Sequence, residues 1–174
     1  HKGQAVARLL APYADGLELN LSCPHAKGYG MAMGQDPELV AEIVSAVKNA
    51  VSIPVVPKWT PNTDRIGEIA TAAARAGADA ICAINTVGPG AHTAHGHDVL
   101  SNGVGGLSGK GVLAVAQKCI RDIRAVTDLP IIGCGGVSSM DDVTAMRSAG
   151  AEVIGVGSAL TGMTTEEMKA YFAD

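Results

Sequence analysis

Aromatic side chains are scarce in this chain: they make up 3% of its 174 residues, with one Trp and one Phe. Hydrophobic residues nevertheless amount to 47%, and Gly occurs 22 times. An apolar interior must therefore be built from Ala, Val, Ile and Leu, which suit buried parallel strands alternating with helices better than a sandwich or a coiled coil. The length suits one domain with a sizeable core.

Excess positive charge, long apolar runs and closely spaced cysteines are also lacking. The net charge of −4 offers no basic patch to a nucleic acid. No apolar run approaches the roughly eighteen residues that cross a membrane, and no signal-peptide pattern opens the chain. No two of the four cysteines have zinc or thioredoxin spacing. We therefore expect a cytoplasmic protein that binds neither nucleic acid nor membrane.

Five apolar runs have the length of buried strands, with helical patterns before and between them. The expected strands are 16–21, 54–58, 80–84, 130–133 and 153–156, and the expected helices are 4–13, 37–51, 65–76, 111–126 and 140–149. Pro57 lies inside the second strand. Because Pro cannot donate a hydrogen bond to a neighbouring strand, we predict a bulge or an irregular strand end there.

Strict alternation of strands and helices predicts a parallel α/β fold, either a doubly wound sheet or a (β/α)8 TIM barrel. A doubly wound sheet expects a Gly-rich loop after its first strand, whereas Ser22, Cys23 and Pro24 stand there. Polar and Gly-rich residues follow the carboxyl end of each strand, as in barrel active sites. We therefore predict the barrel, of which this chain holds roughly strands 4 to 8.

Residues 1–174 are expected to form a single domain, the C-terminal part of such a barrel. A complete barrel typically needs about 250 residues. The chain begins with His1 rather than Met and enters a helical pattern at once, so we expect an N-terminal truncation. An inactive barrel fragment is one alternative, because open sheet edges and an exposed interior destabilise part of a barrel.

Chemically capable side chains follow the first two expected strands. Alternation places Asn20 and Ser22 on one face, and an Asn amide suits an amide or imide ring. Cys23 precedes Pro24, which favours an extended backbone with the thiol at the rim; it is either reactive or an inert buried Cys. Lys58 ends the second strand, where it either meets an electron-rich partner or extends to solvent from the rim.

Asn85 and Thr86 follow the third strand, where they either belong to a binding site or cap a turn.

Gly-rich segments 133–136 and 155–158 follow the last two strands, and each leads towards a helix. Such loops form the phosphate cradle of barrel enzymes, since glycines let backbone N–H groups approach phosphate oxygens. Segment 105–109 could join them. A phosphorylated ligand is therefore predicted.

Together these residues resemble the dihydroorotate dehydrogenase family, including the related barrel domain of dihydropyrimidine dehydrogenases. The motifs that carry the resemblance are 18–25, 34–38, 58–62, 84–86 and the pair 133–136 with 155–160. The resemblance implies a flavoprotein that oxidises (S)-dihydroorotate to orotate in pyrimidine biosynthesis, with FMN as cofactor.

The resemblance also implies roles for single residues. Cys23 matches the base that removes the C5 proton while the C6 hydride passes to flavin N5, and a Cys there resembles the soluble class. Lys58 matches the catalytic lysine beside the flavin. The matched substrate contacts are Asn20, Ser22, Asn85 and Thr86. The matched FMN contacts are Lys58, Gly109, Cys134, Gly135, Gly136, Gly157 and Ser158.

Two matters stay open. The family usually has Asn where this chain has His25. Because His occurs there in the dihydropyrimidine dehydrogenase branch, reduction of uracil or thymine is the alternative reaction. The electron acceptor is either fumarate or NAD, the latter through a partner subunit with FAD and an iron–sulfur cluster. The expected assembly is a homodimer or a heterotetramer.

Segment 26–33 is a candidate lid. His92, His95 and His97 are interpreted as solvated loop residues, and no metal is expected.

Overall fold

The computed structural model describes residues 2–22 and 33–173. Its main sheet has five parallel strands in the order β1-β2-β3-β8-β9. These are β1 (Leu17–Asn20), β2 (Val55–Trp59), β3 (Ile81–Ala83), β8 (Ile131–Cys134) and β9 (Val153–Gly155). The strand order follows the chain without reversal, as in a barrel and unlike a doubly wound sheet. The five strands expected from the sequence are confirmed.

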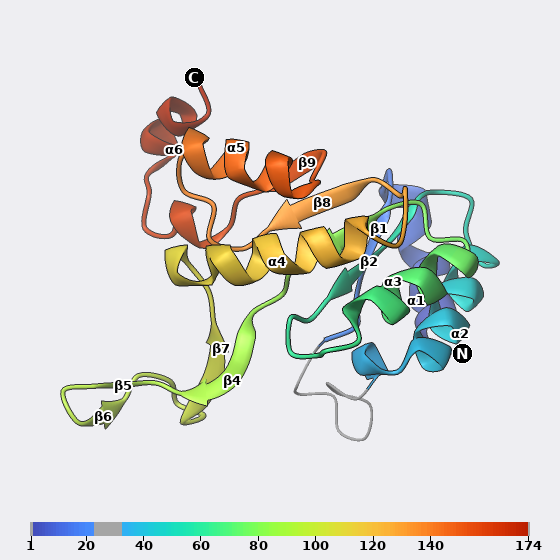
Figure 1. The fold of residues 1–174 in the computed structure, drawn as a ribbon, viewed down its shortest axis with the longest axis horizontal. Coiled ribbons are helices and arrows are strands. Elements are labelled where there is room, and N and C mark those ends of the chain that lie inside the picture. Colours follow the sequence, from blue (N-terminus) through green and yellow to red (C-terminus); the bar gives the residue numbers. More distant parts are fainter. Residues whose placement is uncertain (1, 23–32, 174) are drawn as a thin grey trace.

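Helices precede, separate and follow these strands: α1 (Lys2–Leu10), α2 (Pro37–Lys48), α3 (Ile66–Arg75), α4 (Leu113–Arg124), α5 (Met140–Ala149) and α6 (Thr165–Tyr171). The first five of these helices were expected from the sequence. Consecutive helices from α1 to α5 pack against one another, so the helical layer repeats the order of the sheet (Figure 1). The short α6 was not predicted.

Local sequence explains where α2 begins and which face it buries. The carboxylate of Asp36 accepts hydrogen bonds from the backbone N–H groups of Glu38 and Leu39, with Pro37 in the first turn. Val40, Val44 and Val47 recur at helical spacing and are all buried. Each buried Val side chain contributes about 1.5–3 kcal/mol to the free energy of folding.

Gly133 sets the close approach of helices to the sheet at β8. A Cβ at this position would lie 2.7 Å from the Cβ of Ala151 and 3.0 Å from Cδ1 of Ile120. Ile120 is fully buried on α4, and Met146 on α5 is fully buried as well. The small residue therefore lets the helical layer seat against the strand that leads into the candidate site.

The prediction of a bulge or irregular end at Pro57 is wrong. β2 runs through Pro57 in continuous register with β1, where Leu19 is its partner. The carbonyl oxygens of Val55 and Trp59 accept hydrogen bonds from the β3 side, so the backbone of the intervening Pro57 faces β3 too. Pairing of β2 with β3 involves Lys58 and Trp59 only. The side of Pro57 that lacks an N–H therefore faces β3 at a point where the two strands are not yet paired, because their pairing begins at Lys58.

A hairpin arm with two short antiparallel ladders occupies the stretch between β3 and α4, where the sequence predicted a loop. β4 (Val87–Ala91) pairs antiparallel with β7 (Val104–Leu107), and β5 (Thr93–Ala94) pairs with β6 (His97–Asp98). At the tip, His95 and Gly96 both have positive φ, 52° and 80°. Figure 1 shows the arm projecting away from the main sheet. No helix within residues 2–22 and 33–173 is long and apolar enough to span a membrane.

Candidate active site

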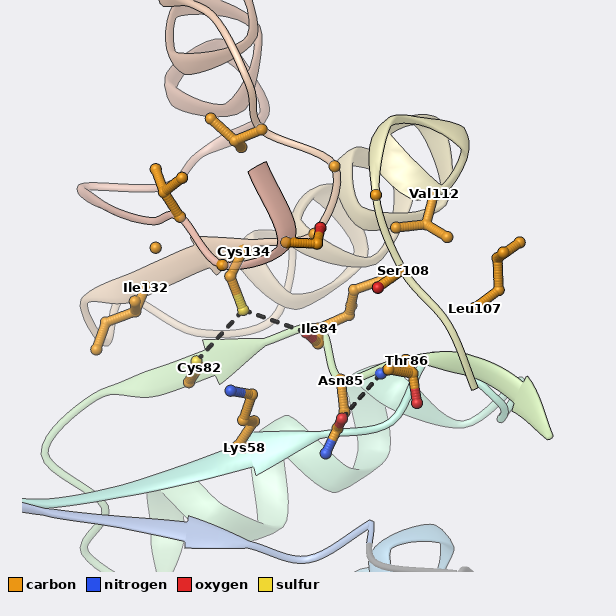
Figure 2. Close-up of a pocket in the computed structure, with 18 of the residues that line it drawn as sticks. Lys58, Cys82, Ile84, Asn85, Thr86, Leu107, Ser108, Val112, Ile132 and Cys134 are labelled. Atoms are coloured by element: carbon orange, nitrogen blue, oxygen red, sulfur yellow. Dashed lines mark hydrogen bonds between the residues drawn. The ribbon is translucent and has the colours of Figure 1, made fainter. Parts of the chain in front are cut away.

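One row of side chains crosses the main sheet at the level of Lys58. Asn20 on β1 is in register with Lys58 on β2, Lys58 with Cys82 on β3, and Cys82 with Ile132 on β8. Residues in register on parallel strands share a face of the sheet. Lys58, Cys82 and Ile132 line a cavity of about 340 Å³ (Figure 2). This volume lies in the range of small-molecule sites.

Three Gly-rich segments close one part of this cavity. Ser108 and Gly109 come after β7, Gly135 and Gly136 after β8, and Gly157 and Ser158 after β9. The residues matched to FMN contacts therefore all line one cavity: Lys58, Gly109, Cys134, Gly135, Gly136, Gly157 and Ser158. Their contacts with a flavin stay predictions.

The backbone of these segments fits a phosphate-bearing flavin. Gly136 has φ of +82°, and a Cβ there would lie 2.7 Å from the backbone nitrogen of Leu113, so only Gly is accommodated. A Cβ at Gly157 would meet no atom within 4 Å, which leaves its backbone open to a ligand. Ile84, Ile132 and Val156 supply apolar wall for a planar ring. An anionic group at the glycines and an aromatic ring along the apolar wall therefore match the lining.

Lys58 enters the cavity with a carboxylate behind it. Its Nζ donates to Oε1 of Glu18 on β1 at 3.1 Å, and the Lys58 side chain is 26% exposed. Partial burial by itself lowers the pKa of Lys58, but the neighbouring Cys134 and Cys82 and the hydrogen bond with Glu18 outweigh burial and raise the pKa above its ordinary value. Lys58 is therefore a permanent cation in the cavity wall.

Two cysteines face each other beside Lys58. The sulfur atoms of Cys82 and Cys134 are 3.7 Å apart, and the thiol of Cys134 donates to the carbonyl oxygen of Ile84 at 3.2 Å (Figure 2). The hydrogen bond with Cys82 lowers the pKa of Cys134, burial opposes this, and Lys58 reinforces it. The same hydrogen bond and burial raise the pKa of Cys82. Any negative charge in this pair therefore resides on Cys134.

Asn20, Ser22 and Asn85 form a hydrogen-bonded cluster at the carboxyl ends of β1 and β3. Nδ2 of Asn85 donates to Oγ of Ser22 at 2.6 Å and to Oδ1 of Asn20 at 3.1 Å. Oδ1 of Asn20 also accepts from the backbone N–H and the hydroxyl of Ser22. Oδ1 of Asn85 accepts from the backbone N–H of Thr86 at 2.9 Å. The structure therefore brings together all four residues matched to substrate contacts.

A second cavity, of about 210 Å³, adjoins the first. Ser22, Thr60 and Asn62 line it together with the arm residues Gly105 and Gly106. Asn85 and Thr86 line both cavities and so form the boundary between them. Asn20 is absent from both sets of described lining residues and is joined to them by its hydrogen bonds with Ser22 and Asn85. The arrangement suits two ring-shaped ligands on either side of a polar boundary.

Some predicted residues lie outside the described ranges, and some described residues were not given a role. Cys23, His25 and the candidate lid 26–33 lie outside residues 2–22 and 33–173. Glu18 and Cys82 line the first cavity without having been assigned to it. Strand alternation could have identified Glu18, which shares a strand face with Asn20.

The three arm histidines do not gather into a metal site. Nε2 of His92 lies 2.9 Å from the carbonyl oxygen of Gly105, inside the arm. Across residues 2–22 and 33–173, no group of three or more His, Cys, Asp or Glu side chains could hold a metal ion.

Comparison with known proteins identifies the family to which this chain belongs. A family model described as dihydroorotate dehydrogenase matches residues 3–169. The dihydroorotate dehydrogenase B (NAD(+)) catalytic subunit of Pyrococcus horikoshii is 47% identical over 156 residues, which cover 89% of this chain and 52% of that protein. The subunit of the same name from Methanosarcina acetivorans is 50% identical over 153 residues, 87% of this chain and 49% of that protein. The chain thus spans about half the length of these curated relatives.

A solved structure shows the same fold. The crystal structure of DHODH from Eimeria tenella in complex with ferulenol superposes with a TM-score of 0.76 at 22% sequence identity, covering 90% of this chain and 48% of that chain. The prediction that these strand–helix units are part of a (β/α)8 barrel is confirmed.

Proposed function

Because the chain belongs to the dihydroorotate dehydrogenase family, we propose that this protein oxidises (S)-dihydroorotate to orotate in pyrimidine biosynthesis, with FMN as its cofactor. One observation carries the proposal. The hydrogen-bonded cluster of Asn20, Ser22 and Asn85 stands at the boundary of a cavity that contains Lys58 and the Gly-rich segments. A polar ring and a phosphate-bearing flavin would thus meet at Asn85 and Thr86.

FMN, when bound, supplies the hydride acceptor. Gly109, Gly135, Gly136, Gly157 and Ser158 would hold its phosphate end, since their backbone approaches the cavity without side-chain bulk. Lys58 would hold a fixed positive charge beside the ring, where it stabilises negative charge that develops during reduction. Cys134 lies next to Lys58 and would contact the same ring.

The substrate would bind through amide and hydroxyl groups. Asn offers both donors and an acceptor, and Ser and Thr hydroxyls rotate to serve as either. Asn20, Ser22, Asn85 and Thr86 can therefore complement the alternating N–H and C=O groups of a dihydropyrimidine. The bonds among Asn20, Ser22 and Asn85 orient these side chains before a ligand arrives, which lowers the entropic cost of binding.

Cys23 is proposed as the base that removes the C5 proton of the substrate. It follows Ser22, which lines the second cavity, by one residue in the sequence. A thiol with an ordinary pKa near 8.5 is only a few per cent ionised at neutral pH, so a pH profile that rises towards alkaline values is expected. Replacement of Cys23 by Ser should shift this profile to higher pH and lower kcat.

We further propose that electrons leave through a partner subunit. The relatives from Pyrococcus and Methanosarcina are named as catalytic subunits of an NAD(+) enzyme. A subunit with FAD and an iron–sulfur cluster in a heterotetramer would provide that route; a homodimer that reduces fumarate is the alternative. NADH formation on addition of the co-expressed partner would support the first, and fumarate reduction by the isolated protein the second.

The decisive experiment uses the purified flavin-loaded protein without oxygen. Dihydroorotate should bleach the flavin absorbance, and orotate should accumulate in equal amount. Uracil reduction with NADPH and no response to dihydroorotate would favour the dihydropyrimidine dehydrogenase reaction instead. A colourless protein that takes up no added FMN would contradict both and favour the inactive-fragment alternative.

A further inference from the structure

The side chain of Asn62 joins the turn after β2 to the segment that follows β3. Its Nδ2 donates to Oγ1 of Thr60 at 2.8 Å, to the carbonyl oxygen of Thr86 at 3.3 Å and to that of Gly88. Its Oδ1 accepts from the backbone N–H of Gly88 at 2.9 Å. Both donor hydrogens and the acceptor of the amide are thereby used within the protein.

These bonds exceed what a turn requires. An Asn in a turn usually bonds to backbone groups within a few residues of itself. Here the backbone N–H of Asn62 already donates to the buried Thr60 hydroxyl at 3.1 Å, which closes the turn without the amide. The side-chain amide instead reaches Thr86 and Gly88, which are 24 and 26 residues away.

The segment that Asn62 holds forms the boundary between the two cavities. Asn85 and Thr86 line both, whereas Asn62 lines the second cavity and is not among the described residues that line the first. Thr86 has little freedom on its other side, because a Cβ at Gly106 would lie 1.9 Å from its Oγ1. Asn62 on one side and Gly106 on the other thus fix where Thr86, and with it Asn85, stands.

We propose that Asn62 is a positioning residue that fixes Asn85 and Thr86 at the boundary of the two cavities and thereby sets the affinity for the pyrimidine ring. The identity of that ring rests on the proposed function; the anchoring itself does not. An amide is required because two carbonyl oxygens and one N–H must be satisfied together, which only a group with both donors and an acceptor can do.

The test is Asn62→Asp in the flavin-loaded protein. The introduced carboxylate keeps the acceptor for Gly88 N–H but turns an oxygen towards the carbonyls of Thr86 and Gly88. The KM for dihydroorotate should rise about 10- to 100-fold because Asn85 and Thr86 are no longer held in place, with kcat and flavin content near those of the unaltered protein and a lower melting temperature from the two unsatisfied carbonyls. Protonation restores a donor, so the KM ratio of variant to unaltered protein should fall as the pH drops from about 8 to about 5.

Gln35→Ala is the matched control. Gln35 donates to the backbone carbonyl of Asn62 at 2.7 Å, so this change loosens the same turn but leaves the amide of Asn62 intact. Its KM should stay within about twofold of the unaltered value, a free-energy change below the usual worth of one hydrogen bond. A KM for Asn62→Asp that matches the unaltered protein, or an equal rise in Gln35→Ala, would overturn the proposal.

A second measurement separates this proposal from the proposed function. In Asn62→Ala, the backbone amide of Gly88 loses its acceptor and should exchange with solvent deuterium faster, while amides of β8 keep their rates. This readout needs no substrate and no turnover. If the unaltered protein does not oxidise dihydroorotate, the proposed function fails alone; if Gly88 exchange is unchanged in the variant, the anchoring fails.

Discussion

The hydroxyl oxygen of Ser22 lies 2.6 Å from Nδ2 of Asn85, although the two residues are 63 positions apart in the sequence. Their strands are not neighbours, since β2 lies between β1 and β3 in the sheet. The contact therefore forms above the end of β2, where the loops after the two outer strands converge. This polar contact depends on the curvature of the whole sheet rather than on any one strand.

Asn85→Ala should raise the KM for dihydroorotate about 10- to 100-fold, because it removes a recognition amide and leaves the Ser22 hydroxyl and Asn20 amide without their shared donor. Steady-state kinetics and the dissociation constant of orotate would measure this. Asn49→Ala is the control, since Nδ2 of Asn49 donates to the hydroxyl of Ser45 at the end of α2, away from both cavities. Equal effects of the two changes would argue against a role for Asn85.

Lys58→Met should lower kcat about 100- to 1000-fold, since it removes a preorganised charge from the site of reduction. The flavin should also become harder to reduce, which a redox titration would show as a lower midpoint potential. Lys118→Met is the control: Lys118 pairs with Asp122 at 2.6 Å on the exposed side of α4. An unchanged potential in Lys58→Met would place the lysine away from the flavin ring.

Gly136→Ala and Gly157→Ala should separate folding from cofactor binding. The added Cβ at Gly136 would lie within 2.8 Å of three atoms of Leu113, at a positive φ of 82°, so both melting temperature and flavin content should fall. At Gly157 the Cβ meets no protein atom within 4 Å, so the melting temperature of the flavin-free protein should hold while FMN binds more weakly. Equal flavin affinity in Gly157→Ala and the unaltered protein would contradict the phosphate cradle.

Asp142→Asn should remove a pH-dependent part of the stability. Lys110 pairs with the buried Asp142, and this pair together with the N–H of Ser138 holds the pKa of the carboxyl well below its usual range. The pKa of Asp142 is lower in the folded protein than in the unfolded protein, where it is near 3.9. The ionised carboxylate therefore stabilises the fold at pH values above about 3.9, and this stabilisation is lost as the pH falls through the folded pKa.

The difference in unfolding free energy between Asp142→Asn and the unaltered protein should therefore be largest near neutral pH and shrink below about pH 4. Chemical denaturation at several pH values would measure it. Asp141→Asn, a change at the exposed neighbouring residue, provides the control. A difference independent of pH would mean that the charge of Asp142 contributes nothing.

Local patterns predicted the main sheet and singled out many residues that line the candidate site. Buried strands can be recognised by their apolar runs, and active-site residues of barrels lie at the carboxyl ends of the strands. Asn20, Lys58 and Asn85 could therefore be singled out from the sequence alone. The Gly-rich segments could be found for the same reason. Which of these residues share a cavity depends on register, which sequence spacing does not give.

The arm and α6 were not predicted because their sequences show only weak strand and helix patterns. β4 and β7 are rich in Gly, which lowers strand propensity, and they form through pairing with each other. α6 has seven residues, too few to show a helical period, although its Thr164–Glu167 capping box was readable in the sequence.

Roles that depend on distant partners were also beyond the sequence. Lys58 is 40 residues from Glu18, and the partners of Asn62 stand 24 and 26 residues away from it. The prediction at Pro57 was wrong for a similar reason. Whether a missing N–H disturbs a strand depends on which neighbouring strand it faces, and the sequence does not give that.

The hairpin arm has a consequence for the continuity of the chain. β3 and β8 are paired neighbours in the sheet, yet the whole arm lies between them in sequence. A cut at the tip, between His95 and Gly96, would leave one polypeptide with Lys58 and Asn85 and another with the Gly-rich segments. Sheet pairing and the β4–β7 ladder could rejoin them, so the molecule offers a natural place to divide it into two complementing halves.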